Sequence, residues 1–329
     1  MIRSLIAAMA FGTILSGPSA SLEEGAQPSR RDSAAPTAVE WTVSPSHRDG
    51  QVQLSLSYRT NGSNSQTSRP WPIQRLQGLS AGQLNGGSGP ASFRIAADAG
   101  SLDCAGALRA GRGGGTCEFR PDRAYAAELE RRGFGRATDR QLYHLAVQGV
   151  GRELIAALEQ HGYARTDVDG LVAAGIHGVT ADYVRGMAQA GYRVGSLDKL
   201  VEFRIHGVTT DFVRELAAAS PDLVRLHADR LVEMRIHGVS PRFVREMREA
   251  GLRELTPARL VEMRIHAVSP AFVREMSQLG YRDLPVSQLV AMRIHGVTPG
   301  WVRQLHARGI RPASSEDLVG LRIHGGRFE

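Results

Sequence analysis

The sequence lacks most of the features by which membrane proteins and metalloenzymes are recognised. No segment of its 329 residues is apolar for long enough to span a bilayer as a helix, since the longest such run, "LIAAMAFGTIL", is too short. The chain also lacks the H-E-x-x-H pattern of zinc peptidases, the P-loop of nucleotide-binding proteins and the C-x-x-C pair of redox enzymes. These absences remove the usual sequence evidence for a membrane-spanning protein, a zinc hydrolase or a nucleotide-driven enzyme.

Lysine is nearly absent as well. Lys199 is the only one, so arginine supplies almost all of the positive charge, and the net charge is +7. A basic chain can indicate an anionic partner. Here the arginines are spread thinly, and no segment carries the block of like charges that marks a nucleic-acid-binding tail. The charge therefore does not by itself predict binding to nucleic acid.

The N-terminus predicts export. Arg3 gives residues 1–20 a short positive start, the apolar run follows, and "SGPSA" supplies small residues for cleavage near Ala20, as in a secretory signal peptide. Residues 21–39 are polar and rich in Pro, Ala and Ser, which is typical of a flexible linker. We therefore expect a periplasmic or secreted protein that has no membrane span once its signal is removed.

The two cysteines are consistent with that compartment. Cys104 and Cys117 flank the glycine-rich stretch "ALRAGRGGGT". A hairpin turning near residues 110–111 would place them opposite each other, and an oxidising compartment would let them form a disulfide. The alternative is a pair of buried thiols that act as small apolar residues.

Residues 40–121 predict a small β domain. "QVQLSLSYRT" alternates apolar and polar residues with a period of two, as a half-buried strand does. "ASFRIAA", "SLDCAGAL" and "TCEFR" are further short strand candidates, because clusters of Gly, Pro and Asn bound them.

From residue 122 onward the chain repeats itself. A Gly-Val pair, or its Ala-Val or Gly-Gly variant, returns every 29 residues, with one step of 31. This period defines seven units, 122–150, 151–179, 180–208, 209–239, 240–268, 269–297 and 298–326. The two extra residues of the fourth unit fall around positions 220–221, where we expect a loop. A period of this length is typical of proteins built from small structural repeats.

Each unit predicts two short helices, as unit 240–268 illustrates. Ser240 is a favourable N-cap and Pro241 suits the first helical position. Gly251 can adopt the left-handed conformation that ends the first helix. Thr256 and Pro257 then open a second helix by the same chemistry.

In the second helix, the spacing of the apolar residues predicts a buried face made of Leu260, Val261, Ile265 and Val268. On this interpretation Ile265→Asp would bury an unpaired charge and cost several kcal/mol. Helices of about ten residues are not stable alone in water, so neighbouring units must cover one another. The predicted fold class is α+β multidomain, with a small N-terminal β domain followed by an all-α solenoid of seven two-helix repeats over residues 122–329.

A histidine recurs at one place in six units, and an arginine stands two residues before it in the last five. We call these residues the ladder. The histidines are His177, His206, His237, His266, His295 and His324, with Gln148 in the first unit, and the arginines are Arg204, Arg235, Arg264, Arg293 and Arg322. Zinc needs ligand nitrogens about 2 Å from one ion, whereas equivalent positions of packed helices lie about 8–10 Å apart. This spacing disfavours a metal site.

Each ladder histidine comes directly before the glycine, or Ala267, that follows its helix. Carbonyl groups there lack partners, and the helix dipole is negative. Imidazole or guanidinium groups can donate hydrogen bonds to those carbonyls. We therefore expect the ladder to cap helices, with a partner-binding face as the alternative.

Two further motifs indicate weaker alternatives. "GLSAG" matches the G-x-S-x-G nucleophile pattern around Ser80, but it lies in a β-rich region without the strand–turn–helix context of a hydrolase. "LAVQGVGRELIAAL" resembles the helix-hairpin-helix motif, whose backbone amides grip a phosphate, with Gly149 and Gly151 as its two glycines. Later units replace the second glycine with Thr or Ser.

The words "LVEMRIHGVSPRFVREM" resemble tandem repeats of uncharacterised bacterial exported proteins, and similar repeats are appended outside the membrane in relatives of the β-lactam-sensor metallopeptidases. The stretch "DAGSLDCAGALRAGRGGGTCEF" is similar to the glycine-rich β segment before those repeats, where aromatic residues usually replace Cys104 and Cys117. The resemblance covers roughly residues 50–326. It implies an extracytoplasmic sensing or scaffolding context.

Together these patterns predict a non-enzymatic, exported repeat protein that binds another protein or an envelope component, without cofactor or metal. The first alternative is a nucleic-acid-binding array of helix-hairpin-helix-like units. A serine hydrolase that uses Ser80 is the weaker one.

Overall fold

The structure is a computed structural model, and it describes residues 34–36, 38–60, 63–163 and 166–325. The predicted signal peptide, 1–20, and most of the predicted linker, 21–39, lie outside these residues. Among the described residues, no helix combines the length and the apolar character that crossing a bilayer requires.

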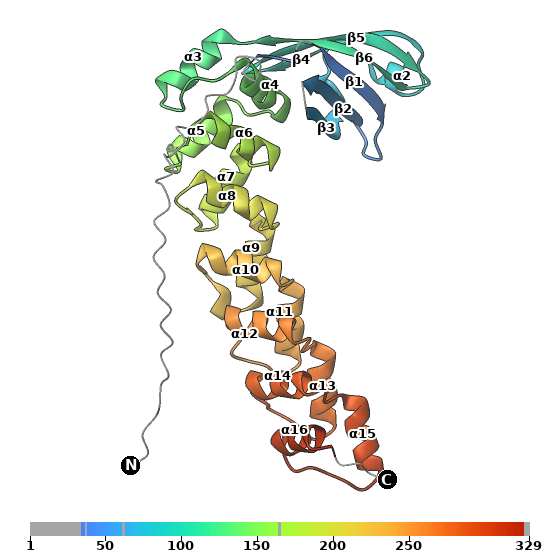
Figure 1. Cartoon of the computed structure of the whole chain (residues 1–329), viewed down its shortest axis with the longest axis vertical. Helices are drawn as coiled ribbons and strands as arrows, with labels where there is room; N and C mark the ends of the chain where they lie inside the picture. Colours follow the sequence, from blue (N-terminus) through green and yellow to red (C-terminus); the bar gives the residue numbers. More distant parts are fainter. Residues whose placement is uncertain (1–33, 37, 61–62, 164–165, 326–329) are drawn as a thin grey trace, which may run out of the picture.

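The N-terminal part of the described chain forms one antiparallel sheet of six strands (Figure 1). The strands are β1 (Val39–Pro45), β2 (Gln51–Thr60), β3 (Ser63–Pro72), β4 (Gly89–Ala97), β5 (Gly100–Arg109) and β6 (Arg112–Pro121). Their order across the sheet is β3-β2-β1-β6-β5-β4. The sequence indicated β2, β4, β5 and β6, but neither β1 nor β3. Since β3 is an edge strand with the polar sequence "SNSQTSRPWP", it has no apolar alternation to detect.

The predicted cysteine hairpin is confirmed. Cys104 on β5 and Cys117 on β6 are direct partners in the strand register, and a disulfide joins them. The turn consists of Ala110 and Gly111, whose φ angles of 52° and 72° are both positive. Two central residues with positive φ are the signature of the tight hairpin turn whose twist matches that of the strands.

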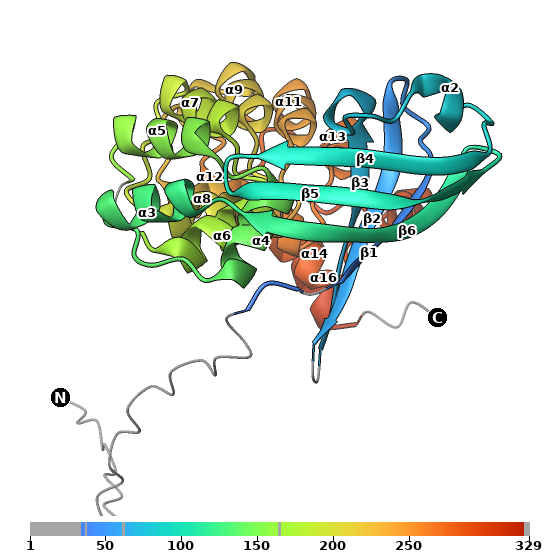
Figure 2. The same cartoon turned by 90° about the horizontal axis from the view of Figure 1, so that it is seen from above.

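Helix α4 (Asp139–Gln148) attaches the helical region to the sheet by packing against β4, β5 and β6. The ring of Tyr143 meets Tyr58 and Phe119 edge to face, with centroids 5.1 and 5.5 Å apart. His144 Nε2 lies 2.9 Å from the Tyr58 hydroxyl, and burial lowers the pKa of this histidine. Figure 2 shows the sheet lying across the end of the helical region, so the two parts share one core.

Fourteen described helices follow the sheet, after the short η1 (Ile73–Arg75) and α2 (Ala81–Leu84) within it. They are α3 (Arg123–Arg131), α4, α5 (Arg152–Gln160), α6 (Val168–Ile176), α7 (Ala181–Gln189), α8 (Leu197–Ile205), α9 (Thr210–Ala219), α10 (Ala228–Ile236), α11 (Pro241–Glu249), α12 (Pro257–Ile265), α13 (Pro270–Gln278), α14 (Val286–Ile294), α15 (Pro299–Ala307) and α16 (Ser315–Ile323). The extra residues of the fourth unit form η2 (Pro221–Leu223). The expected order, a β region followed by a helical region, is therefore confirmed.

The helices alternate between two rows that descend from the sheet (Figure 1). The first row runs from α5 through α7, α9, α11 and α13 to α15, and each member contacts the next. The second row runs from α4 through α6, α8, α10, α12 and α14 to α16 in the same way. Equivalent residues of successive second-row helices therefore follow one another along this row.

The predicted caps are present. The Ser240 side chain accepts a hydrogen bond from the Phe243 amide at the start of α11, and Thr256 does the same for Arg259 at the start of α12. Gly251 follows α11 with a φ of 104°. These local signals fix where each nine-residue helix begins and ends, and packing between neighbours supplies the stability that such short helices lack.

The predicted buried face of α12 is partly wrong. Leu260, Val261 and Val268 are buried as expected, but Ile265 is 55% exposed and Met263 is buried instead. At about 100° per residue, Ile265 lies roughly 140° around the helix from Leu260, whereas Met263 lies about 60° away on the other side. The contact with neighbouring helices is centred between Leu260 and Met263, so Ile265 faces outward.

This geometry reverses the expectation for Ile265→Asp. We expect this substitution to change the free energy of unfolding by less than about 0.5 kcal/mol, as exposed substitutions do. The control Met263→Asp should cost several kcal/mol, because it buries an unpaired charge. Urea denaturation followed by circular dichroism measures both, and a similar loss in the two variants would contradict the assignment.

Candidate functional site

A row of exposed isoleucines, here called the isoleucine stripe, follows the second row of helices. Its members are Ile176, Ile205, Ile236, Ile265, Ile294 and Ile323, each the last residue of its helix. They are 52–59% exposed, and Val224 is the only other large apolar residue with such exposure in the described part of the chain. Single exposed apolar residues are ordinary. Exposure at one position of six successive units instead marks a regular surface.

The ladder histidines lie beside the stripe, one residue further along the chain. Each is the C-cap residue of its helix, and its backbone amide hydrogen-bonds to carbonyls of the last turn. The imidazoles are exposed or half-exposed and have no hydrogen-bond partner among the described residues. Side-chain capping of the helix end, which the sequence suggested for imidazole or guanidinium, must therefore come from the arginines.

The ladder arginines reach across the unit boundaries. Arg204 Nε donates a hydrogen bond of 3.2 Å to the carbonyl of His177, at the end of the preceding second-row helix. The guanidinium of Arg204 also lies 5.0 Å from the ring centre of Tyr183 in its own unit. Arg235 likewise bonds the His206 carbonyl at 3.1 Å. The guanidiniums of Arg235, Arg264, Arg293 and Arg322 lie over Phe212, Phe243, Phe272 and Trp301 at 4.9–5.3 Å.

The glycine after the histidine leaves room for these arginines. A Cβ on Gly207 would lie 2.7 Å from Arg235 Nη2, and one on Gly238 would lie 3.0 Å from Arg264 Nη2. At the boundary between units 240–268 and 269–297, Ala267 takes the place of the glycine and has a φ of 55°. There Arg293 Nε is buried without a hydrogen-bond partner among the described residues. The alanine therefore adds backbone strain at a boundary where the guanidinium bond is missing.

The first boundary is built differently, because unit 151–179 has no ladder arginine. Gly175 stands in its place, and a Cβ there would meet Val150 Cγ2 at 2.6 Å. Arg75 from the β region lies beside Gly149, as a ladder arginine lies beside the corresponding glycine of a later unit. Its Nη1 is 3.4 Å from where a Cβ on Gly149 would be. Arg69 on β3 donates a hydrogen bond to the Val147 carbonyl in the last turn of α4. The sheet thus supplies two arginines where the repeat supplies none.

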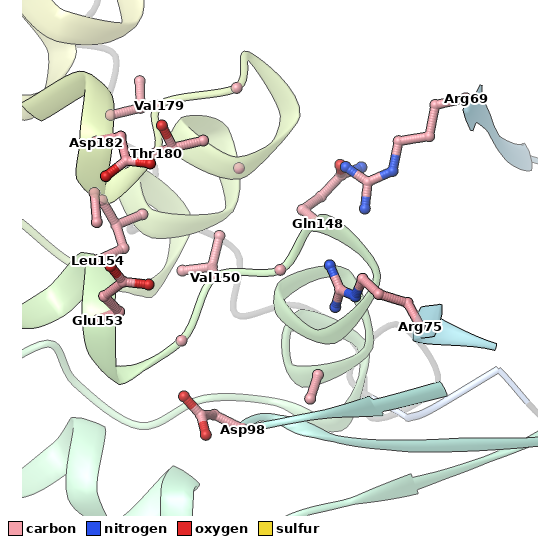
Figure 3. Close-up of a pocket in the computed structure, with 16 residues that line it drawn as sticks. Arg69, Arg75, Asp98, Gln148, Val150, Glu153, Leu154, Val179, Thr180 and Asp182 are labelled. Atoms are coloured by element: carbon pink, nitrogen blue, oxygen red, sulfur yellow. The ribbon is translucent and has the colours of Figure 1, made fainter. Parts of the chain in front are cut away.

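A cavity of about 450 Å³ remains at this boundary, here called the junction cavity (Figure 3). The figure shows Arg69 and Arg75 reaching from the β region toward Gln148. Both guanidiniums lie against the Trp71 ring, at 4.5 and 5.2 Å. Burial, and then the charge of Arg75, lowers the pKa of Arg69. Neither Arg69 nor Arg75 stands in a pattern that the sequence displays, and the only sequence signal for this cavity is the missing arginine at position 175.

The acidic residues of the junction cavity are already paired with arginines. Asp98 accepts hydrogen bonds from the backbone amide and from Nη1 of Arg152, at 2.7 and 2.9 Å. Glu153 and Asp182 both bind Arg185, at 2.7 Å. Arg75, in contrast, has neither a hydrogen bond nor an ion pair among the described residues. The donors of Arg75 are therefore the ones that the cavity leaves unused.

The structure does not support a phosphate site of the helix-hairpin-helix type next to this cavity. Gly149 has the expected left-handed conformation, and Gly151 is the N-cap of α5. The amide at the start of α5 that could hold a phosphate is bound to Asp98 instead. In later units the N-cap side chain binds the amide of the third helical residue, and these N-caps are Thr180, Thr209, Ser240, Ser269 and Thr298. The last three units also have proline at the position of Arg152, so they lack that amide altogether.

Ser80 lies in a helix cap. Its hydroxyl accepts a hydrogen bond from the Gln83 amide and donates one to Gln83 Oε1, as the N-cap of the four-residue α2. Histidine is absent from its hydrogen-bond partners in the described structure. The described residues also contain no group of three or more His, Cys, Asp or Glu side chains placed to share a metal ion.

The exchange of glycine for alanine at the boundaries generates a prediction. We expect Ala267→Gly to raise the free energy of unfolding by about 1 kcal/mol, because the left-handed conformation costs other residues about 1–2 kcal/mol and the freer unfolded chain offsets part of the gain. The matched variant Gly238→Ala should lower it by a similar amount. Urea denaturation midpoints give both values, and a lower midpoint for Ala267→Gly would refute the role of this residue.

Known proteins do not supply a function for this arrangement. The resemblance to exported repeat proteins stays an expectation of the sequence, and the stripe and the junction cavity have to be interpreted from their own geometry. Comparison of the chain with protein-family models, with curated proteins and with solved structures gave no match.

Proposed function

We propose that the chain is an exported, non-enzymatic scaffold in which seven two-helix repeats form an α-solenoid that binds another protein along the isoleucine stripe. The carrying observation is the exposure of isoleucine at one position of six successive units. Leaving an apolar side chain in water forgoes about 1.5–3 kcal/mol of burial, and doing so in six of the seven units has no benefit for the fold. A surface of this kind is typical of a binding site.

The solenoid interpretation is supported by the repeated boundary. Successive helices contact one another within each row, and ladder arginines of successive units lie over the aromatic ring of their own unit. Repeat arrays of this type hold together through nearest-neighbour contacts and present extended surfaces to their partners.

The partner that fits the stripe best is an amphipathic helix. Packed helices lie about 8–10 Å apart, so the isoleucines of neighbouring units are separated by about that distance. Side chains seven residues apart on a helix are separated by about 10.5 Å along its axis. A helix laid along the stripe can therefore place one apolar side chain beside each isoleucine, as helices bound in grooves do.

A protein partner has better support than the two alternatives. The amides at the helix starts are bound by Asp98 or by N-cap side chains, which leaves a nucleic-acid backbone without the grip that the helix-hairpin-helix motif provides. The Ser80 hydroxyl is used in a helix cap, which removes the main support for hydrolysis.

Site-specific photo-crosslinking tests the stripe. We expect benzoylphenylalanine at Ile236, or at Ile265, to give one discrete crosslinked protein in the cells that make this chain. The control is Arg245, which is exposed on the first-row helix α11. Equal adducts at Arg245, or none at the two isoleucines, would refute the docking surface.

The identity of the adduct decides the occupant. A crosslinked segment with apolar residues at every seventh position supports the helix, and an extended or proline-rich segment would overturn that choice. An adduct with a second copy of this chain, matched by a dimer in analytical ultracentrifugation, would replace the partner by self-association.

Export is proposed from the predicted signal and from the Cys104–Cys117 disulfide, since such bonds persist in oxidising compartments. We expect mass spectrometry of the protein from the cell envelope to find a chain that begins near residue 21 and whose two cysteines resist alkylation until reduced. A full-length chain with free thiols in the cytoplasmic fraction would contradict export.

A further inference from the structure

We propose that the junction cavity binds a small ligand through an oxyanion, a carboxylate or a phosphate group, which Arg75 holds with the help of Arg69. The cavity, about 450 Å³, has a volume typical of small-molecule sites. It lies between the β region and the first three units, and Arg204 of the third unit approaches its edge at Gly178. This site is independent of the isoleucine stripe.

The two arginines form a pair of like charges without a counterion. Both guanidiniums lie against the Trp71 ring, which holds them on the same side of the cavity. Arg69 spends one donor on the Val147 carbonyl, and Arg75 has no hydrogen-bond partner among the described residues. Like charges placed together repel each other, and an anion between them would relieve this repulsion while it accepts the free N–H donors.

The carboxylates on the other wall of the cavity do not bind these two arginines. The carboxylates of Asp98, Glu153 and Asp182 are bound by Arg152 or Arg185. Figure 3 shows Glu153 and Asp182 across the cavity from Arg69 and Arg75. Planar guanidiniums bind carboxylate and phosphate oxygens in pairs, so the ligand class follows from the donors that remain free.

The lining also leaves room for a ligand. Four glycines border the cavity, and these are Gly149, Gly151, Gly175 and Gly178. At later boundaries a ladder arginine lies over an aromatic ring. In unit 151–179 neither partner exists, because Gly175 replaces the arginine and Leu154 replaces the aromatic residue. The cavity therefore occupies the space that the arginine and the aromatic ring fill in later units.

Isothermal titration of the full chain with inorganic phosphate, and separately with succinate, tests this proposal at constant ionic strength set by sodium chloride. We expect saturable binding of at least one anion, and binding at least about tenfold weaker in Arg75→Gln, since a hydrogen bond to a charged group is worth about a factor of ten or more. The matched control is Arg264→Gln, which removes an arginine of the same kind from a boundary without the cavity and should leave the affinity unchanged.

A second measurement covers the case in which Arg75→Gln disturbs the docking of the sheet. In the unaltered chain, the amide resonances of Gly149 and Gly178 should shift on addition of the anion, while those of Gly238 and Gly296 should not. Saturation by phosphate alone assigns a phosphate ligand, and saturation by succinate alone assigns a carboxylate. The proposal is overturned if neither anion saturates, if Arg75→Gln binds equally well, or if chloride causes the same shifts.

Discussion

Three boundaries between units depend on one interaction, the placement of an arginine between an aromatic ring of its own unit and a carbonyl at the end of the helix before it. The guanidinium lies over the ring, and Nε of Arg204, Arg235 or Arg264 donates a hydrogen bond to the His177, His206 or His237 carbonyl of the preceding unit. Lysine could not replace arginine here, because stacking and directed donation both need a planar group. At these positions, arginine in place of lysine therefore has a structural reason.

The exposure of the isoleucines does not depend on this contact, since Ile176 is 54% exposed in the unit that has Gly175 in place of the arginine. What all six units share is a residue with positive φ, a glycine or Ala267, two positions after the isoleucine. The chain turns away there, and the isoleucine at the helix end is left exposed. An apolar residue is kept there although packing does not require it, and for this reason the stripe, rather than the histidines, is the strongest candidate for a binding surface.

Much of the fold could be predicted from local signals, and the failures have physical causes. The period, the caps at Ser240 and Thr256 and the cysteine hairpin depend on short-range chemistry that the sequence displays directly. The exposure of Ile265 could not be found from helical periodicity alone, because the direction of the buried face is set by the neighbouring helices. The strand β3 was missed because an edge strand needs few apolar residues. The roles of Arg69 and Arg75 depend on the contact between sheet and helices, which no local pattern contains.

The likeness of the boundaries at His177, His206 and His237 has a consequence for how the helical region can change in length. Each of them joins an arginine of one unit to the carbonyl of the unit before it. Duplication or deletion of unit 180–208 would therefore recreate the same arginine bond at the new boundary. Such a change would lengthen or shorten the isoleucine stripe and leave the distinct boundary next to the sheet as it is.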